Sequence, residues 1–172
     1  MSPRYGNLLE EALEAWSYVR DGVIAELSII PLERLEFRPT PKSRTVADLA
    51  RHIVESGLMA SGELTRQDGD FTRQPYPRFI HEYASHVKGI EEKDDLIAML
   101  QQSHAAGDAQ FREAGELFML QYIRRFDGQP GTRLAWLYHA IEHESYHRGQ
   151  IALYARFLGL VPALTRQITG QA

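Results

Sequence analysis

Two histidines four residues apart, His143 and His147, are the residues of this chain whose spacing is most suggestive of chemistry. On a helix, four residues rise about 6 Å and turn about 40° net, so both imidazoles lie on one face and can bind one metal ion. The neighbouring positions on this face are mainly apolar, so we expect the pair to point into a core. Unpartnered imidazole nitrogens would cost about 1–3 kcal/mol each there. We favour a metal site over two core histidines bonded to carbonyl groups.

Residues 143–147 also match the H-E-x-x-H pattern of zinc proteases, in which Glu144 would be the general base. Those enzymes need a third ligand downstream, and residues 148–172 contain no His, Asp, Glu or Cys. Glu144 lies about 100° around the helix from His143, at the edge of the apolar stripe. We therefore do not predict a zinc protease, and a polar flanking role for Glu144 competes with a catalytic one.

The third ligand of a catalytic metal site should then lie upstream, because such sites usually combine three protein ligands with an open position. His52 ranks first, since it shares the apolar face of its predicted helix with Leu49 and Met59. His104 follows by a small margin, near the edge of another apolar face.

The roles of the other histidines stay open. His81 and His86 fall in an irregular stretch and could line the mouth of a pocket. His139 lies about 12 Å along the helix axis from His147, too far to share one ion.

Four stretches with the 3- and 4-residue apolar spacing of helices must position these residues. Pro31 ends the first, Thr45 and Asp48 resemble a capping box before the second, and Gly159 follows the last. The predicted helices comprise residues 5–30, 45–65, 94–115 and 132–158.

A long, aperiodic crossover at residues 67–93 separates the second helix from the third. Residues 116–126 could form another short helix, and residues 127–131 are a clear break. No run alternates with period two, so strand signals are weak. Four helices with one long middle connection predict an all-α four-helix bundle, formed as a single domain by residues 1–172.

Composition excludes several classes of protein. The 172 residues carry a net charge of −4, without the basic surplus of a nucleic-acid-binding protein. No apolar stretch approaches the ~18 residues of a membrane span. The absence of cysteine excludes disulfides, thiolate metal sites and a catalytic protein thiol. With no apolar run typical of a signal peptide at the N-terminus, we expect a cytoplasmic protein.

Two segments carry a resemblance to a known family. Residues 44–53 (RTVADLARHI) and 143–151 (HESYHRGQI) resemble the second-helix and C-terminal motifs of the DinB family, the DinB/YfiT-like metalloenzymes. Residues 158–162 and the order of the four helices fit as well. The resemblance implies a bundle with up-down-down-up connectivity, commonly a homodimer. It also implies that His52, His143 and His147 bind a divalent ion, most often zinc or nickel.

Some members of that family are transferases or isomerases that use a low-molecular-weight thiol, so the resemblance implies a small-molecule substrate. A divalent ion on three neutral imidazoles would ionise a bound thiol or lower the pKa of bound water toward about 7. A thiol-dependent S-transferase or isomerase, or a hydrolase, is therefore expected. Glu55, Glu144, Tyr146 and Gln150 are weak candidates for catalytic groups around the ion.

A non-catalytic metal-binding or dimerising helical module is the alternative. The last predicted helix has a second apolar stripe, which could be buried against neighbouring helices or form a self-association face. The stripe comprises Leu134, Leu137, Tyr138 and Ile141.

Overall fold

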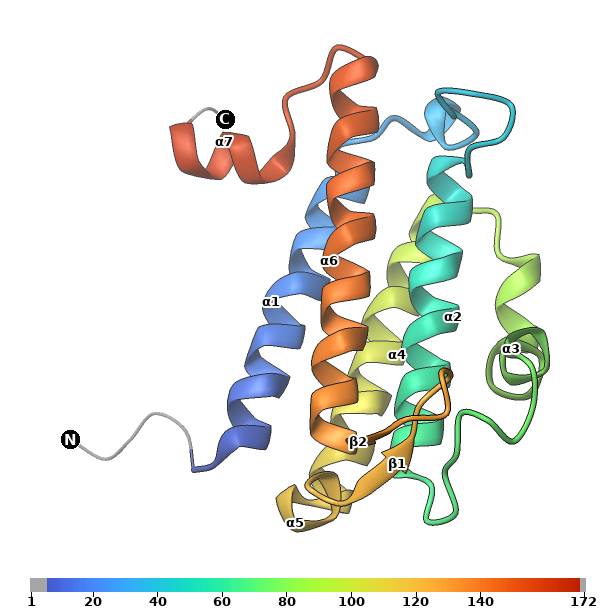
Figure 1. Cartoon of the computed structure of the whole chain (residues 1–172). Coiled ribbons are helices and arrows are strands. Elements are labelled where there is room, and N and C mark those ends of the chain that lie inside the picture. The colour runs from blue at the N-terminus through green and yellow to red at the C-terminus, as the bar shows by residue number, and fades with distance from the viewer. Residues whose placement is uncertain (1–5, 171–172) are drawn as a thin grey trace.

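A computed structural model describes residues 6–170 of the chain (Figure 1). Four long helices dominate the fold, and five short helical segments and two short strands connect or flank them. The elements are α1 (Leu8–Ser28), η1 (Leu32–Arg34), α2 (Val46–Thr65), α3 (Tyr76–Ala84), η2 (Ser85–Gly89), α4 (Lys93–Ala114), α5 (Glu116–Met119), β1 (Tyr122–Arg124), β2 (Pro130–Thr132), α6 (Arg133–Phe157) and α7 (Ala163–Thr169).

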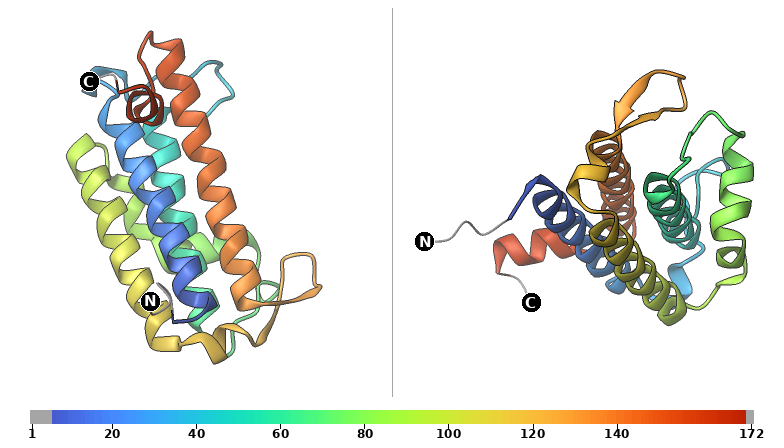
Figure 2. Two further views of the ribbon diagram at one scale, coloured as in Figure 1. Left: turned by 90° about the vertical axis from the view of Figure 1, so that its left-hand side faces the viewer. Right: turned by 90° about the horizontal axis from the view of Figure 1, so that it is seen from below.

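The four long helices form the predicted bundle. Helices α1 and α6 run upward in Figure 1, whereas α2 and α4 run downward, which confirms the up-down-down-up connectivity. Helix α2 packs on α4 and α6, and α1 packs on α6 and α4. The long crossover joins the parallel helices α2 and α4, and it carries α3 along the outer side of α2 (Figure 2). No helix within residues 6–170 is long and apolar enough to cross a membrane.

The helix ends follow local capping chemistry. The Thr45 hydroxyl accepts a hydrogen bond from the Asp48 backbone N–H at 3.0 Å, and the Asp48 carboxylate accepts one from the Thr45 backbone N–H at 3.2 Å. This is the predicted capping box, with Asp in place of the usual Glu or Gln. At the end of α6, Gly159 adopts a φ of 76°, which favours glycine. The predicted start of the first helix at residue 5 lies outside the described residues.

The crossover contains a helix that the sequence analysis missed. Helix α3 begins after Pro75 and has Pro77 in its first turn, where proline is tolerated because no intrahelical N–H bond is needed there. Its nine residues are too short to show a clear period, and Phe79 is its main buried anchor. The prolines therefore mark the start of a helix here, although they suggested irregular structure.

The predicted helix at residues 116–126 is only partly present. Helix α5 ends at Met119, and the chain then forms β1, which pairs antiparallel with β2 so that Tyr122 lies opposite Thr132. The intervening turn places Gly128 at a φ of 79°. Strands of three residues are too short for alternation to be visible in the sequence. Helix α7 was also not predicted; the buried Glu26 carboxylate caps it by accepting the backbone N–H groups of Ala163 and Leu164.

The second apolar stripe of α6 belongs largely to the core. Leu134, Leu137 and Ile141 are buried, and Tyr138 alone is exposed. Burial inside the bundle therefore accounts for the stripe without a self-association face. The homodimer remains a prediction that light scattering would test.

The core has two apolar clusters with polar residues between them. On α6, Ile141 belongs to one cluster and Ile151 to the other, and the histidine motif lies between these residues. On α1, Val19 and Val23 belong to different clusters, and the buried Arg20 lies between them. The bundle thus contains a polar layer across its middle, and this layer carries the candidate site.

Candidate metal centre

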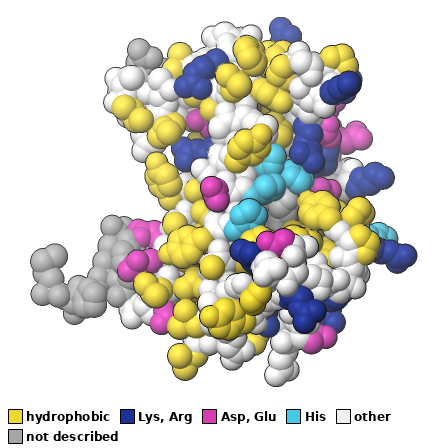
Figure 3. All heavy atoms as spheres, viewed as in Figure 1, with side chains coloured by type: hydrophobic (Ala, Val, Ile, Leu, Met, Phe, Trp, Pro, Cys, Tyr) yellow, Lys and Arg dark blue, Asp and Glu magenta, His cyan; other side chains and the backbone are white. Residues whose placement is uncertain are grey.

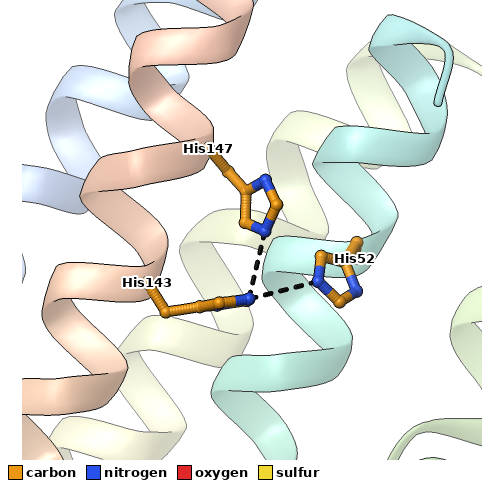
Figure 4. A group of neighbouring side chains, drawn as sticks. All are labelled: His52, His143 and His147. Atoms are coloured by element: carbon orange, nitrogen blue, oxygen red, sulfur yellow. Dashed lines mark hydrogen bonds between the residues drawn. The ribbon is translucent and has the colours of Figure 1, made fainter. Parts of the chain in front are cut away.

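Three histidine side chains from two helices converge in the polar layer (Figure 4). His52 projects from α2, and His143 and His147 project from consecutive turns of α6. The Nε2 atom of His143 lies 3.3 Å from Nε2 of His52 and 3.1 Å from Nε2 of His147. One ring nitrogen from each residue lies within 4.8 Å of the others. The structure therefore brings together the three histidines selected from the sequence.

The three imidazole nitrogens are arranged in a way that suits a shared metal ion better than hydrogen bonds among the rings. The Nδ1 atom of His147 lies 2.7 Å from Oε1 of Gln150, so Nδ1 carries the proton and Nε2 presents a lone pair. Without a cation, a single proton on Nε2 of His143 would serve two acceptors, or two lone pairs would face each other. A divalent cation can accept a lone pair from every ring, and imidazole nitrogen is a common ligand of such ions.

The surroundings keep the three rings in the neutral form that a ligand requires. Burial, the positive charge of Arg44 and the other two rings lower the pKa of His52 to about 3. Burial, together with His147, His139 and Arg44, lowers the pKa of His143 to about 4. Burial also lowers the pKa of His147, although the hydrogen bond to Gln150 opposes this shift. All three rings are therefore neutral at pH 7.

Three of the four weak catalytic candidates lie beside the histidines. Gln150 accepts a hydrogen bond from His147, and its own amide nitrogen lies 3.3 Å from the hydroxyl of Tyr146. Tyr146 is exposed, and its ring centroid lies 5.2 Å from that of His147. A Glu55 carboxylate oxygen lies 3.9 Å from Nδ1 of His52, and burial raises the pKa of this carboxyl. The hydrogen bond to Gln150 orients the His147 imidazole, as groups behind metal ligands commonly do, whereas Glu55 is too far from His52 for a hydrogen bond.

The expectation that Glu144 is a polar residue at the edge of the apolar stripe is wrong, because its side chain is buried between α6 and α1. Its carboxylate accepts hydrogen bonds from Arg20 Nε at 2.5 Å, from Arg20 Nη2 at 2.9 Å and from the Trp16 indole at 2.9 Å. Only 3% of Glu144 is exposed. A carboxylate held by three donors on α1 is a structural partner, so the H-E-x-x-H match does not supply a general base here.

The remaining histidines do not join the cluster. His104 packs its ring against Trp16, with centroids 4.5 Å apart, and contacts the Ser17 hydroxyl at 3.4 Å. His81 and His86 are exposed on the crossover. The ring of His139 stacks on Trp136, with centroids 4.4 Å apart. This places His139 at a pocket rather than at the ligand cluster.

The sequence analysis missed this pocket, which adjoins His143. Segments far apart in the chain supply its walls: the second half of α2, the α2–α3 connection with the start of α3, the β1–β2 turn and the first half of α6. Figure 3 shows histidine side chains reaching the surface in the middle of one face, next to hydrophobic and basic side chains. The lining residues are Ser56, Met59, Ala60, Phe71, Tyr76, Phe126, Trp136, His139, Ala140 and His143. No local period could have revealed a wall that is assembled from several separate segments.

Comparisons with known proteins agree with this geometry. A family model described as the DinB family matches residues 1–169. A DinB-like protein of Bacillus subtilis shares 20% identity, with a TM-score of 0.65 over 87% of this chain and 92% of that one. Another B. subtilis protein, YfiT, described as a probable metal-dependent hydrolase, shares 15% identity, with a TM-score of 0.70 over 93% of each chain.

A third similar structure is that of a mycothiol-dependent maleylpyruvate isomerase. It shares 15% identity, with a TM-score of 0.66 over 88% of this chain and 63% of that one. At these identities the structural likeness establishes the fold. No curated protein matches the sequence significantly.

Proposed function

This chain belongs to the DinB family, and from that premise we propose that it is a divalent-metal-dependent enzyme whose ion is held by His52, His143 and His147. The convergence of three neutral imidazole nitrogens within 4.8 Å carries the proposal. The set leaves room for a further ligand, which distinguishes catalytic metal sites from closed structural ones. Zinc and nickel are the proposed ions, since both accept imidazole ligands.

The proposed reaction uses an external low-molecular-weight thiol, as in an S-transferase or isomerase. When bound, a divalent ion would ionise a thiol or acidify water, because its charge favours the anionic form of either. The chain contains no cysteine, so any sulfur nucleophile must come from outside. The Glu144 carboxylate is committed to Arg20 and Trp16, so we do not assign it as the base for this nucleophile. The mycothiol dependence of the similar isomerase supports this choice.

Residues around the histidines would hold the site in its working form. Gln150 keeps the proton of His147 on Nδ1, which leaves the lone pair of Nε2 free to bind a metal ion. Glu55 approaches Nδ1 of His52 and favours the same tautomer there. The aromatic walls beside His143 would exclude water from a bound substrate, and low local polarity strengthens electrostatic interactions with it.

Hydrolysis is the second candidate function. The similarity to YfiT supports it, and Glu55 is the one candidate carboxylate that lies next to the histidines without an ion pair to arginine. In this reaction Glu55 would accept a proton from the attacking water. Activity with esters or amides in the absence of any thiol would favour hydrolysis over thiol transfer.

The test begins with elemental analysis of protein purified without a nickel column. We expect about one divalent ion per chain in the wild type, and loss of that ion in the variant His147→Ala. The exposed His81 provides a matched control, since His81→Ala should retain the metal. Turnover is then measured with panels of thiol-conjugation, isomerisation and hydrolysis substrates.

Each outcome has a defined meaning. A wild type that takes up no divalent ion, or a His147→Ala variant that retains it fully, contradicts the proposed site. Full metal occupancy without turnover in any panel would instead support a non-catalytic metal-binding module.

A further inference from the structure

The pocket beside His143 has aromatic walls. The Phe71 ring centroid lies 4.8 Å from that of Phe126 and 5.9 Å from that of Trp136. The Tyr76 ring centroid lies 6.2 Å from that of Phe126. All four side chains line the cavity. Rings at these separations interact through their faces and edges, and a further ring can join them in the same way.

The pocket has a buried floor and an accessible rim. Phe71 and Met59 are 2% and 7% exposed, and they lie at its floor. Phe126 and Tyr76 are exposed and lie at its rim. His143 lines the pocket and also belongs to the histidine cluster. A ligand can therefore enter past the rim, bury an apolar end on the floor and keep another part next to His143.

The volume of the cavity suits one ring with a short substituent. Its volume is about 260 Å³, and an apolar cavity of about 150 Å³ is enough to bind benzene. A peptide or a nucleotide is too large to be enclosed there. The pocket therefore limits its ligand to a small molecule.

The wall of the cavity contains no acidic or basic side chain of fixed charge. Of the described residues that line it, none is Asp, Glu, Lys or Arg. Arg125 lies over the Trp136 ring, but it pairs with Asp127 at 2.9 Å and does not line the pocket. A charged group would lose its hydration in this cavity without gaining an ion-pair partner. The part of a ligand that enters the pocket is therefore uncharged.

Hydrogen bonds on two sides hold the part of the wall that the crossover supplies. The Phe71 backbone N–H donates to the Arg124 carbonyl of β1 at 3.0 Å. The preceding residue, Asp70, donates its backbone N–H to the buried Glu63 carboxylate of α2 at 2.7 Å. Arg73 donates to the same carboxylate at 2.6 Å. Because these bonds fix the wall before a ligand binds, less ordering is required on binding.

We propose that this pocket binds the aromatic ring of a small substrate, which packs among Phe71, Phe126 and Trp136. The inference rests on the proposed function, since it names the substrate class of that site: small molecules that carry one aromatic ring. The uncharged ring would occupy the floor of the pocket, and its substituent would lie next to His143. Contacts between aromatic rings would select this ligand over a saturated one of similar size.

Binding of the ring is measured by NMR through the indole N–H signals of the two tryptophans. Trp136 lines the pocket, whereas Trp16 does not and donates its N–H to Glu144 at 2.9 Å. Trp16 is therefore an internal reference, and the variant Trp136→Phe assigns the two signals. The full-length protein is used as purified and again after removal of divalent ions with EDTA, so that ring binding and metal content are measured separately.

The probes are benzyl alcohol and cyclohexylmethanol, two neutral alcohols that each carry a six-membered ring. The saturated ring is the more apolar of the two, so the hydrophobic effect alone would favour cyclohexylmethanol. We expect the opposite order, because aromatic contacts add to the apolar ones. Benzyl alcohol should shift the Trp136 signal and bind about 2–10-fold more tightly than cyclohexylmethanol, whose affinity is measured by competition. The Trp16 signal should stay unchanged.

Two variants test the location of the ring. Phe126→Ala should weaken the binding of benzyl alcohol by about 3–10-fold. The matched control is Tyr122→Ala, because this tyrosine lies on the same hairpin, is 73% exposed and does not line the pocket. Ala140→Leu fills part of the cavity and should weaken binding by about 10-fold or more. Its control Ala152→Leu, half-buried on the same helix but outside the pocket, should bind benzyl alcohol like the wild type.

Three results would overturn the inference. They are no saturable shift of Trp136 with benzyl alcohol, cyclohexylmethanol binding at least as tightly as benzyl alcohol, or equal affinities in the pocket variants and their controls. The first and third remove the pocket as the binding site, and the second removes its preference for an aromatic ring. Ring binding by a protein that takes up no divalent ion would contradict the proposed function alone. A metal-loaded protein that does not bind the ring would contradict this inference alone.

Discussion

Replacing Glu144 by glutamine should destabilise the protein strongly, because it leaves a buried charge without its partner. The Arg20 side chain is 1% exposed and donates two hydrogen bonds to Glu144, so its charge has no access to water. Removing one partner of a buried ion pair costs about 3–5 kcal/mol. For a chain of this length, each kcal/mol shifts Tm by about 2–4 °C, so we expect Glu144→Gln to lower Tm by roughly 6–20 °C.

The assay is thermal and urea unfolding in a double-mutant cycle. The variant Arg20→Met with Glu144→Gln removes the charges together, while the glutamine oxygen can still accept the Trp16 indole N–H. We expect the double variant to be more stable than the sum of the two single changes predicts, by about 1–3 kcal/mol. Glu142→Gln on the exposed side of α6 is the control and should stay within about 0.5 kcal/mol of the wild type.

The same variant separates a structural carboxylate from a catalytic one. If Glu144 were the general base suggested by the H-E-x-x-H pattern, Glu144→Gln would abolish turnover while Tm stayed within about 2 °C of the wild type, less than the shift for one kcal/mol. That result, or strictly additive single variants, would refute the assignment of Glu144 as the buried partner of Arg20.

Three further predictions concern the same layer of the bundle. Gln150→Leu should weaken metal binding by about 10–100-fold in a competition titration without preventing folding, since it removes only the hydrogen bond that orients His147; unchanged affinity would contradict this role. Gly107→Ala should lower the free energy of unfolding by about 1–3 kcal/mol, because the added Cβ would lie 2.6 Å from the Trp16 ring; a urea midpoint equal to that of the wild type would show that the ring can move away. Burial lowers the pKa of His104, so as the pH falls below about 6.5 the unfolded chain binds a proton at His104 before the folded chain does, and the free energy of unfolding should decrease. Between pH 8 and pH 5.5, His104→Gln should therefore lose less stability than the wild type, and equal losses would count against this linkage.

Much of the scaffold could be predicted from the sequence because long amphipathic helices carry their own periodic signal. The four bundle helices lie within a few residues of their predicted bounds, and the capping box at Thr45 forms as expected. Helix α3 and the β1–β2 hairpin escaped prediction because they are short. Their positions depend on anchors such as Phe79, which pack against distant parts of the chain.

The sequence by itself determined that His143 and His147 share a helix face, since four-residue spacing is a local property of the helix. Helix periodicity left His52 only slightly ahead of His104, and the family resemblance favoured His52; the tertiary structure shows why, because it brings His52 to the other two imidazoles and packs His104 against Trp16. Only the tertiary structure decided the role of Glu144, whose partner Arg20 is 124 residues away in the chain. Periodicity places a side chain on a face of its helix, but the helix packed against that face determines whether it meets a cation, an indole or another imidazole.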